Sequence, residues 1–359
     1  MKRLLSSVVT AAGIVGALTL LSIPAAAQRG GGGGAQSANC PAQPEWQTKF
    51  LADYNAKLAA TQGTPPAAEG GARGGGGRGG GAAAGGGGGR GAGGGGGRGG
   101  GGRGGRGGAQ AELPPVPRIP DNPAYGVQAG KPDFGGLAKG DWNVPYIINM
   151  ATQGHDENGC SPVVVPFTQK ALEIWADREL KTHEKDDPEG FCLPPGVPRM
   201  MYTPYPTQIY QLPDRILFVY EGGAHVWRLI WMDGRKLPNL DDINPDYLGY
   251  SVGHWDGDTL VVETVGFNHV TWLDATGHPH GEKLKVTEKY TRPNFNTLQL
   301  AATIDDPEYY TAPWTTVTTA TWTANTHGPF TMRGGEIMEY ICQENNRDLS
   351  HIGAARDTR

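Results

Sequence analysis

Two stretches of this chain concentrate side chains that could carry chemistry, and the first surrounds Glu288. This residue lies midway between Val286 and Tyr290 in an alternating, strand-like run. Because alternation sends every second side chain to the same face, we expect the Glu288 carboxylate to point inward. A buried carboxylate is either paired or has a raised pKa. Glu288 is therefore either half of a core ion pair, with Arg228 or Arg292, or a general acid or base.

Two histidines are the candidate partners of Glu288 in acid–base catalysis. His280 lies in a long connector, and His225 follows a Gly-Gly turn on a face that we expect to be aromatic. A carboxylate and an imidazole can exchange protons with a substrate, which would suit a lyase, an isomerase or a hydrolase. The alternative is that each is a hydrogen-bonded core residue. The chain has no GxSxG, HExxH or Walker motif, which argues against the common serine hydrolases, zinc proteases and nucleotide enzymes.

The second stretch is the connector from Gly266 to Glu282, which is dense in polar and aromatic residues. Loops of this length at the mouth of a barrel often carry function. If the chain is extended at His278 and His280, both imidazoles point to one side and could bind a metal, with His254 or Glu282 as third ligand. If Pro279 makes a turn instead, the rings diverge. We therefore expect no cofactor and keep a metal at these histidines as the alternative.

The elements that must position these residues are β-strands joined by tight turns, from Thr207 onward. Alternating runs between turn dipeptides predict the strands. The expected strands cover 215–221, 224–232, a hairpin at 246–267, 284–290, 298–304, 315–323 and 336–342. Consecutive antiparallel strands with short connections predict a mainly β fold, an up-and-down barrel. One or two helices flank it, and the second of them lies between Pro166 and His183, with Pro166 and Thr168 suited to its start.

The hairpin at 246–267 has Asp256-Gly257 between two alternating runs, which is a strong hairpin signal. A two-residue loop at that dipeptide pairs Tyr250 with Glu263 and places His254 further along the same side. The opposite face carries small residues beside aliphatic ones. Both faces therefore look covered, and we expect this hairpin inside a barrel or under a packed layer.

A second hairpin is predicted at Gly222-Gly223. Its register places Trp227 and Trp231 on one face with Phe218, and Arg228 on the opposite face. A barrel of about eight strands has room for one small ligand, so our first hypothesis is binding of an apolar or aromatic molecule in the interior. The expected binding residues are Arg228, Trp227, Trp231, Tyr250, His254, Glu263, Asn268, Trp272 and Asp274.

Composition divides the 359 residues into four parts. Residues 1–27 have a basic start, an apolar run and a small-residue exit, which predicts a secretory signal peptide and a periplasmic or secreted protein. Residues 28–63 contain an amphipathic helix with an aromatic stripe every four residues, at Trp46, Phe50 and Tyr54. Residues 64–113 form a Gly/Arg-rich block that predicts a disordered linker, and 114–359 form the barrel domain.

The linker holds six arginines and hardly any acid, whereas the whole chain has a mild net charge of −5. Such segments bind nucleic acid in other settings, but an exported chain rarely meets RNA, so we expect no specific nucleic-acid partner. The same charges would attract an anionic envelope surface. A structural envelope protein tethered by this arm is therefore a third hypothesis. The oligomeric state is left open.

The four cysteines are an even set in a chain that we expect to be exported, which favours disulfides over metal ligands. Three connectivities are possible. We favour Cys192 with Cys342, because both lie beside the barrel, and Cys40 with Cys160, which would tether the N-terminal helix across the linker.

Several sequence words recur together in one order: CLPPGVPRM, GHWDGDTLVVETVGFN, TWLDATGHPH, TEKYTR and TIDDPEYYTAPWT. In these words the segment from Asp187 to Cys342 resembles a large family of exported, mostly uncharacterised bacterial proteins with β-barrel domains. The WDGDTLVVET hairpin also resembles strand pairs of lipocalin-like barrels. The resemblance implies a barrel and export, and no specific biochemistry.

Overall fold

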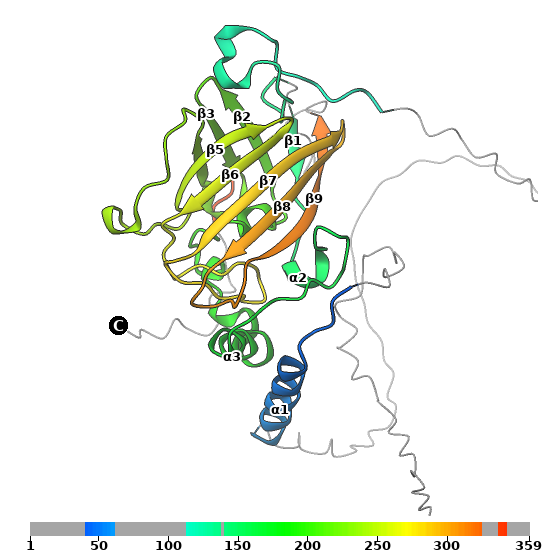
Figure 1. Ribbon diagram of the computed structural model, residues 1–359, viewed down its shortest axis with the longest axis vertical. Helices are drawn as coiled ribbons and strands as arrows, with labels where there is room; N and C mark the ends of the chain where they lie inside the picture. The colour runs from blue at the N-terminus through cyan, green and yellow to red at the C-terminus, as the bar shows by residue number, and fades with distance from the viewer. Residues whose placement is uncertain (1–39, 62–112, 138–139, 325–336, 343–359) are drawn as a thin grey trace, which may run out of the picture. The chain divides into compact units, whose positions relative to one another are not determined.

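The computed structural model describes residues 40–61, 113–137, 140–324 and 337–342 (Figure 1). The predicted signal peptide and all but the last residue of the predicted linker lie outside these ranges. Within them, no helix is both long and apolar enough to cross a membrane.

Nine strands of the described chain form one closed barrel in sequence order, and β1 closes it against β9 (Figure 1). The predicted mainly β barrel with flanking helices is thereby confirmed. The strands are β1 (Gly140–Asn143), β2 (Pro206–Leu212), β3 (Arg215–Tyr220), β4 (Trp227–Trp231), β5 (Tyr250–Asp256), β6 (Thr259–Val265), β7 (Lys285–Asn294), β8 (Thr297–Asp305) and β9 (Trp314–Ala324).

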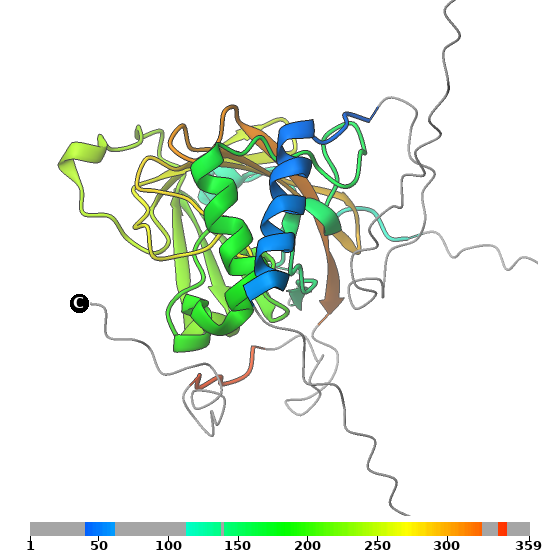
Figure 2. The same cartoon turned by 90° about the horizontal axis from the view of Figure 1, so that it is seen from below.

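Two longer helices, α1 (Glu45–Thr61) and α3 (Gln169–Asp177), lie outside the barrel, as predicted. The Thr168 hydroxyl caps α3 by accepting from the amide of Ala171. The Tyr54 hydroxyl of α1 donates to Asp177 of α3 at 2.9 Å, and the two helices lie side by side (Figure 2). The helices are α1 (Glu45–Thr61), α2 (Met150–Gln153), α3 (Gln169–Asp177) and α4 (Gly222–His225), with shorter turns η2 (Pro123–Gln128), η3 (Arg178–Thr182), η4 (His183–Asp186), η5 (Pro188–Phe191), η6 (Arg199–Met201) and η7 (Leu240–Asp242).

The β5–β6 hairpin exists, but its register differs from the prediction by two residues. The loop is Gly257-Asp258, so Tyr250 pairs with Val265 and Glu263 pairs with Val252. Gly257 has φ +58, as the first position of such a turn requires, which explains the shift. A shift of two keeps each residue on its face, because side chains alternate with period two.

The prediction that both faces of this hairpin are covered is wrong. The inner face is buried at Ser251, Leu260 and Thr264, but on the outer face Tyr250 is 40% exposed. His254 is exposed on that face too. Tyr250, His254 and Glu263 therefore lie outside the barrel.

The prediction for the β3–β4 hairpin is wrong by one residue, and this reverses the faces of β4. Instead of a two-residue turn, Gly222–His225 forms the short helix α4, so that Phe218 pairs with Arg228. A one-residue slip moves every side chain to the other side. Arg228 consequently points into the barrel at 2% exposure, while Trp227, at 61%, points out.

One strand pair departs from the predicted antiparallel order. β4 and β5 run parallel and pair only at Ile230 with Ser251 and at Trp231 with Val252. The connector between them, which contains η7, carries the chain back to the other end of the barrel. Parallel neighbours require such a crossover, whereas a tight turn would have made the pair antiparallel.

The interior of the barrel is filled by large side chains. β7 follows its predicted alternation, with Val286, Glu288 and Tyr290 fully buried. Buried side chains of the other strands, among them Phe218, Ile216, Ile230, Trp142, Leu260 and Leu300, complete the core. The inside of this barrel is a packed core, as in small barrels generally.

Both favoured disulfides are present. Cys40 is bonded to Cys160, and Cys192 is bonded to Cys342. The first attaches the segment before α1 to the barrel domain, and the second attaches residues 337–342. That last segment was predicted to be a strand, but its described residues belong to none.

Candidate functional site

A buried ion pair between Arg228 of β4 and Glu288 of β7 lies at the centre of the barrel. Arg228 Nη2 donates to Glu288 Oε2 at 2.5 Å, and the two side chains are 2% and 0% exposed. The hydroxyl of Tyr290 donates to the other carboxylate oxygen at 2.7 Å. This is the core ion pair foreseen for Glu288, with Arg228 as its partner. Arg292 lies elsewhere and donates to the carbonyls of Asp133 and Phe295.

Two hydroxyls of the β5–β6 hairpin also accept hydrogen bonds from the guanidinium. Arg228 Nε donates to Ser251 Oγ at 3.0 Å, and Nη2 donates to Thr264 Oγ1 at 2.8 Å. Burial alone would lower the pKa of Arg228, but the charge of Glu288 raises it above its usual range. Burial, with the charge of Glu288 adding to it, raises the pKa of Tyr290 well above 10. Arg228 therefore keeps its charge, and a neutral tyrosine lies beside the pair.

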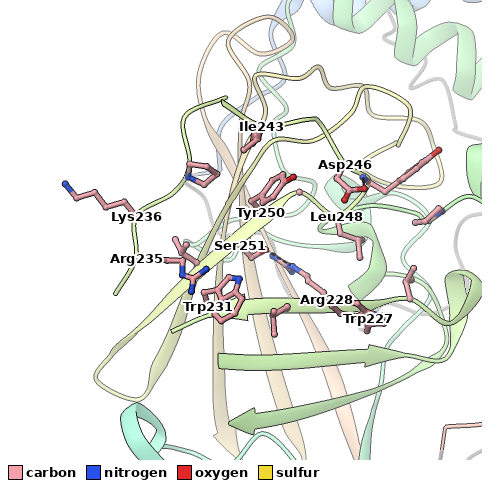
Figure 3. Close-up of a pocket in the computed structure, with 17 residues that line it drawn as sticks. Trp227, Arg228, Trp231, Arg235, Lys236, Ile243, Asp246, Leu248, Tyr250 and Ser251 are labelled. Carbon is pink, nitrogen blue, oxygen red and sulfur yellow. Dashed lines mark hydrogen bonds between the residues drawn. The ribbon is translucent and has the colours of Figure 1, made fainter. Parts of the chain in front are cut away.

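A cavity of about 590 Å³ opens where the β4–β5 ladder stops (Figure 3). Parallel pairing ends at Ile230 and Ser251, so the residues before them, 226–229 on one side and 246–250 on the other, diverge and line the cavity. Gly249 permits the bend at the start of β5, because it has φ +62 and an added Cβ would come within 2.7 Å of the Val265 carbonyl oxygen.

The walls of this cavity are apolar and its outer edge is charged. Aromatic and aliphatic side chains form the walls, and Arg235, Lys236 and Asp246 lie at the edge. The Arg235 guanidinium stacks 3.7 Å from the centre of the Trp231 ring. The principal wall residues are Trp227, Trp231, Ile243, Leu248 and Tyr250 (Figure 3).

Of all the residues that line the cavity, Arg228 and Ser251 alone are buried. The side chain of Arg228 reaches toward Ser251 at the inner end, where their hydrogen bond lies (Figure 3). The cavity is therefore aromatic toward the surface and polar at its inner end, where Arg228 and Ser251 lie.

Four of the predicted binding residues, Arg228, Trp227, Trp231 and Tyr250, come together here. They do so at a gap in the barrel wall, whereas the prediction placed them around an interior cavity. The predicted site residues did not include Ser251, which the sequence analysis placed on the small-residue face of its hairpin, nor Leu248 and the charged edge. The one available signal was the long connector with its Arg235-Lys236 dipeptide, which follows an aromatic strand.

The predicted loop site at 266–282 is packed, because residues 271–281 are all buried. The Asp274 carboxylate accepts from His278 Nδ1 at 2.7 Å and from the amide of Met150 at 2.8 Å. The His278 ring stacks on Phe167, with centroids 5.5 Å apart. Burial would raise the pKa of Asp274, but His278 and the other donors hold it below its usual range. This Asp–His pair fastens the loop.

His280 has its own, separate partners. Its Nε2 is 2.8 Å from Thr271 Oγ1 and its Nδ1 is 3.1 Å from the Gly281 carbonyl oxygen. Burial lowers the pKa of His280 to about 4, so it is neutral at pH 7. The hydrogen bonds of Glu288 go to Arg228 and Tyr290, and none of those among the described residues joins Glu288 to a histidine.

The remaining predicted site residues lie away from the cavity. Glu263 pairs with Lys285 on the outer face at 2.5 Å. Asn268 accepts from the amide of Val270, and Trp272 is buried with the Arg178 guanidinium 4.6 Å from its ring centre. The backbone of His225 ends α4, and its side chain is outside the described part of the structure.

In the described ranges, no group of three or more His, Cys, Asp and Glu side chains is arranged to hold a metal ion. His278 and His280 have separate hydrogen-bond partners.

No family model, curated protein or solved structure matches this chain. The family resemblance of its sequence words therefore stays a prediction.

Proposed function

We propose that this protein binds a small, partly aromatic or apolar molecule in the cavity between β4 and β5. The observation that carries the proposal is the cavity itself, with aromatic walls outside and the buried Arg228 and Ser251 at its inner end. Its volume of about 590 Å³ lies within the range of small-molecule sites, and apolar walls with few polar groups are typical of them.

The exposed aromatic residues support the same function. Trp227 is 61% exposed and Tyr250 is 40% exposed, and both line the cavity. Large aromatic rings gain the most from being covered by a partner, and they dominate binding energies where they are found. A planar ligand lying against these rings would bury surface that the fold leaves open.

We further propose that the chain is exported and that it acts in an oxidising compartment. Two disulfides support this, because such bonds persist in secreted and periplasmic proteins and are rare in the cytosol. The ligand would then be a molecule met outside the cytoplasm.

The experiment uses 8-anilinonaphthalene-1-sulfonate as an aromatic probe whose fluorescence rises in apolar sites. We expect saturable binding of one probe per protein. Trp227→Ala should weaken the affinity about ten-fold, the loss typical of an aromatic residue central to binding. The matched control is Trp46→Ala, since Trp46 is 44% exposed on α1 and lies outside the cavity lining.

Circular dichroism of each variant checks that the barrel remains folded. Equal weakening by the two substitutions, or no saturable binding by the wild-type protein, would contradict the proposed function.

A further inference from the structure

We propose that the ligand of this cavity carries a neutral carbonyl oxygen, which accepts hydrogen bonds from Arg228 at the inner end. This inference rests on the proposed function of the same site and adds the chemical class of the ligand. It follows from counting donors and acceptors around the guanidinium.

The guanidinium of Arg228 has five N–H groups, and the protein accepts from three of them. Nε–H goes to Ser251, and the two hydrogens of Nη2 go to Thr264 and Glu288. Nη1 is buried, and within the described ranges no acceptor meets it in good hydrogen-bond geometry; the Tyr220 hydroxyl is the neighbour within reach. At least one of its two hydrogens is therefore an unmatched donor, on a residue that lines the cavity.

The hydroxyl pair beside it adds a third unmatched donor. The oxygens of Ser251 and Thr264 lie 3.0 Å apart and share one hydrogen, while each also accepts from Arg228. The hydrogen of the second hydroxyl has no further acceptor in the described part of the chain. Ser251 is itself a lining residue, and when Thr264 donates within the pair, the unmatched hydrogen is that of Ser251 at the inner end.

The neighbouring Tyr220 does not remove this surplus of hydrogen-bond donors. Its buried hydroxyl lies within hydrogen-bonding reach of Arg228, although no described residue meets it in good hydrogen-bond geometry. If its oxygen accepts one hydrogen from Nη1, its own hydrogen then lacks an acceptor. The cluster has more hydrogen-bond donors than acceptors, and a ligand oxygen with two lone pairs would supply the missing acceptor. Unmatched buried donors are costly, which gives such an oxygen a large gain on binding.

Charge decides between a neutral acceptor and an anion. Glu288 already neutralises Arg228, with both side chains at most 2% exposed. A ligand carboxylate at this depth would add an uncompensated buried charge, which is expensive. A ketone, amide or ester carbonyl offers the same lone pairs without that charge. The cations Arg235 and Lys236 lie at the outer edge, far less buried than the pair.

The test compares three probes with one ring system in competition with 8-anilinonaphthalene-1-sulfonate. They are 2-acetylnaphthalene, 2-isopropenylnaphthalene, in which a CH₂ group replaces the carbonyl oxygen, and 2-naphthoate. We expect the acetyl compound to bind about ten-fold more tightly than its isopropenyl isostere, as for a hydrogen bond to a charged group. We expect 2-naphthoate to bind more weakly than the acetyl compound.

The variant Arg228→Lys keeps a positive charge beside Glu288 and removes Nη1, so it should abolish the preference for the acetyl compound. The matched control Arg215→Lys changes an outward arginine of β3 that lies over the Trp231 ring, and it should keep the preference. If Arg228→Lys does not fold, the comparison of the three probes in the wild-type protein still decides the question.

Equal affinities for the acetyl and isopropenyl compounds, both weakened by Trp227→Ala, would overturn the carbonyl inference and leave the proposed function standing. Tighter binding of 2-naphthoate would overturn the choice of a neutral group. If none of the probes competes or binds, the inference and the proposed function both fail.

Discussion

Replacing Glu288 by Gln tests whether the buried ion pair holds the barrel together. The change removes one charge and leaves Arg228 as an uncompensated cation at 2% exposure. At the observed separation of 2.5 Å, an effective dielectric constant of about 20 gives an attraction of roughly 7 kcal/mol. The desolvation of the carboxylate, which the substitution also removes, offsets part of this. We expect a loss of about 3–5 kcal/mol in the free energy of unfolding, as is usual when one partner of a buried pair is removed.

The assay is reversible urea unfolding at pH 7 with both disulfides intact, followed by circular dichroism. Glu263→Gln is the matched control, because it makes the same change on the outer face of the adjacent strand. Glu263 pairs with Lys285 at the same distance of 2.5 Å, but these side chains are 33% and 39% exposed. Exposed pairs contribute about 0–1 kcal/mol, so the control should change stability little.

The two ion pairs have the same contact distance and differ in burial, so comparing the two variants tests how burial affects the contribution of the pair to stability. If Glu288→Gln costs no more than Glu263→Gln, burial does not strengthen the pair and our account of the barrel centre is wrong. The same variant bears on catalysis, since a general acid or base at this position would lose turnover in a protein that still folds.

Three further predictions concern the disulfides and two buried titratable groups. Mass-spectrometric mapping should find Cys40 linked to Cys160 and Cys192 linked to Cys342, and any other pairing would contradict the fold. Replacing Cys192 and Cys342 by Ser should lower the free energy of unfolding by about 2–5 kcal/mol. Burial lowers the pKa of His280 to about 4 from 6.5. Between these pH values the unfolded chain binds more protons than the folded chain, so the free energy of unfolding falls as the pH drops, by up to roughly 3 kcal/mol. His280→Gln should flatten that slope in unfolding measurements, and an unchanged slope would show that other groups cause it. Burial, with the charge of Glu221, raises the pKa of Asp141 to about 6 from 3.8, and no described residue donates a hydrogen bond to either carboxylate oxygen. Asp141→Asn should therefore raise stability at pH 7 by about 1–2 kcal/mol, with the gain vanishing toward pH 4; a loss at pH 7 would refute this.

Features set by neighbouring residues could be predicted from the sequence. The inward position of Glu288 follows from alternation within β7, and the start of α3 follows from the capping hydroxyl of Thr168. Both depend on a few adjacent residues, so no distant contact was needed. The number of hydrogen-bonded strands and the closing role of β1 were not foreseen, because β1 has only four residues and its partners lie far along the chain.

The two faces of β4 were predicted the wrong way round, because one residue more or less in the preceding loop decides which side chains point inward. Gly222-Gly223 is a good hairpin signal, yet the chain makes the helical turn α4 there, and the added residue reverses β4. Arg228 and Trp227 exchanged sides as a result. No local pattern distinguishes these two turns, because the choice depends on which β4 face can be buried against the finished barrel.

The sequence by itself determined a mainly β fold and a carboxylate that had to find a partner inside, and it favoured one of the three possible cysteine pairings. The tertiary structure alone decided that the partner is Arg228, sixty residues away. It also decided that β4 and β5 run parallel and separate after two residue pairs, which opens the cavity. The physical reason is that alternation and turn chemistry act over a few residues, whereas ion pairing and strand separation depend on how the whole barrel closes.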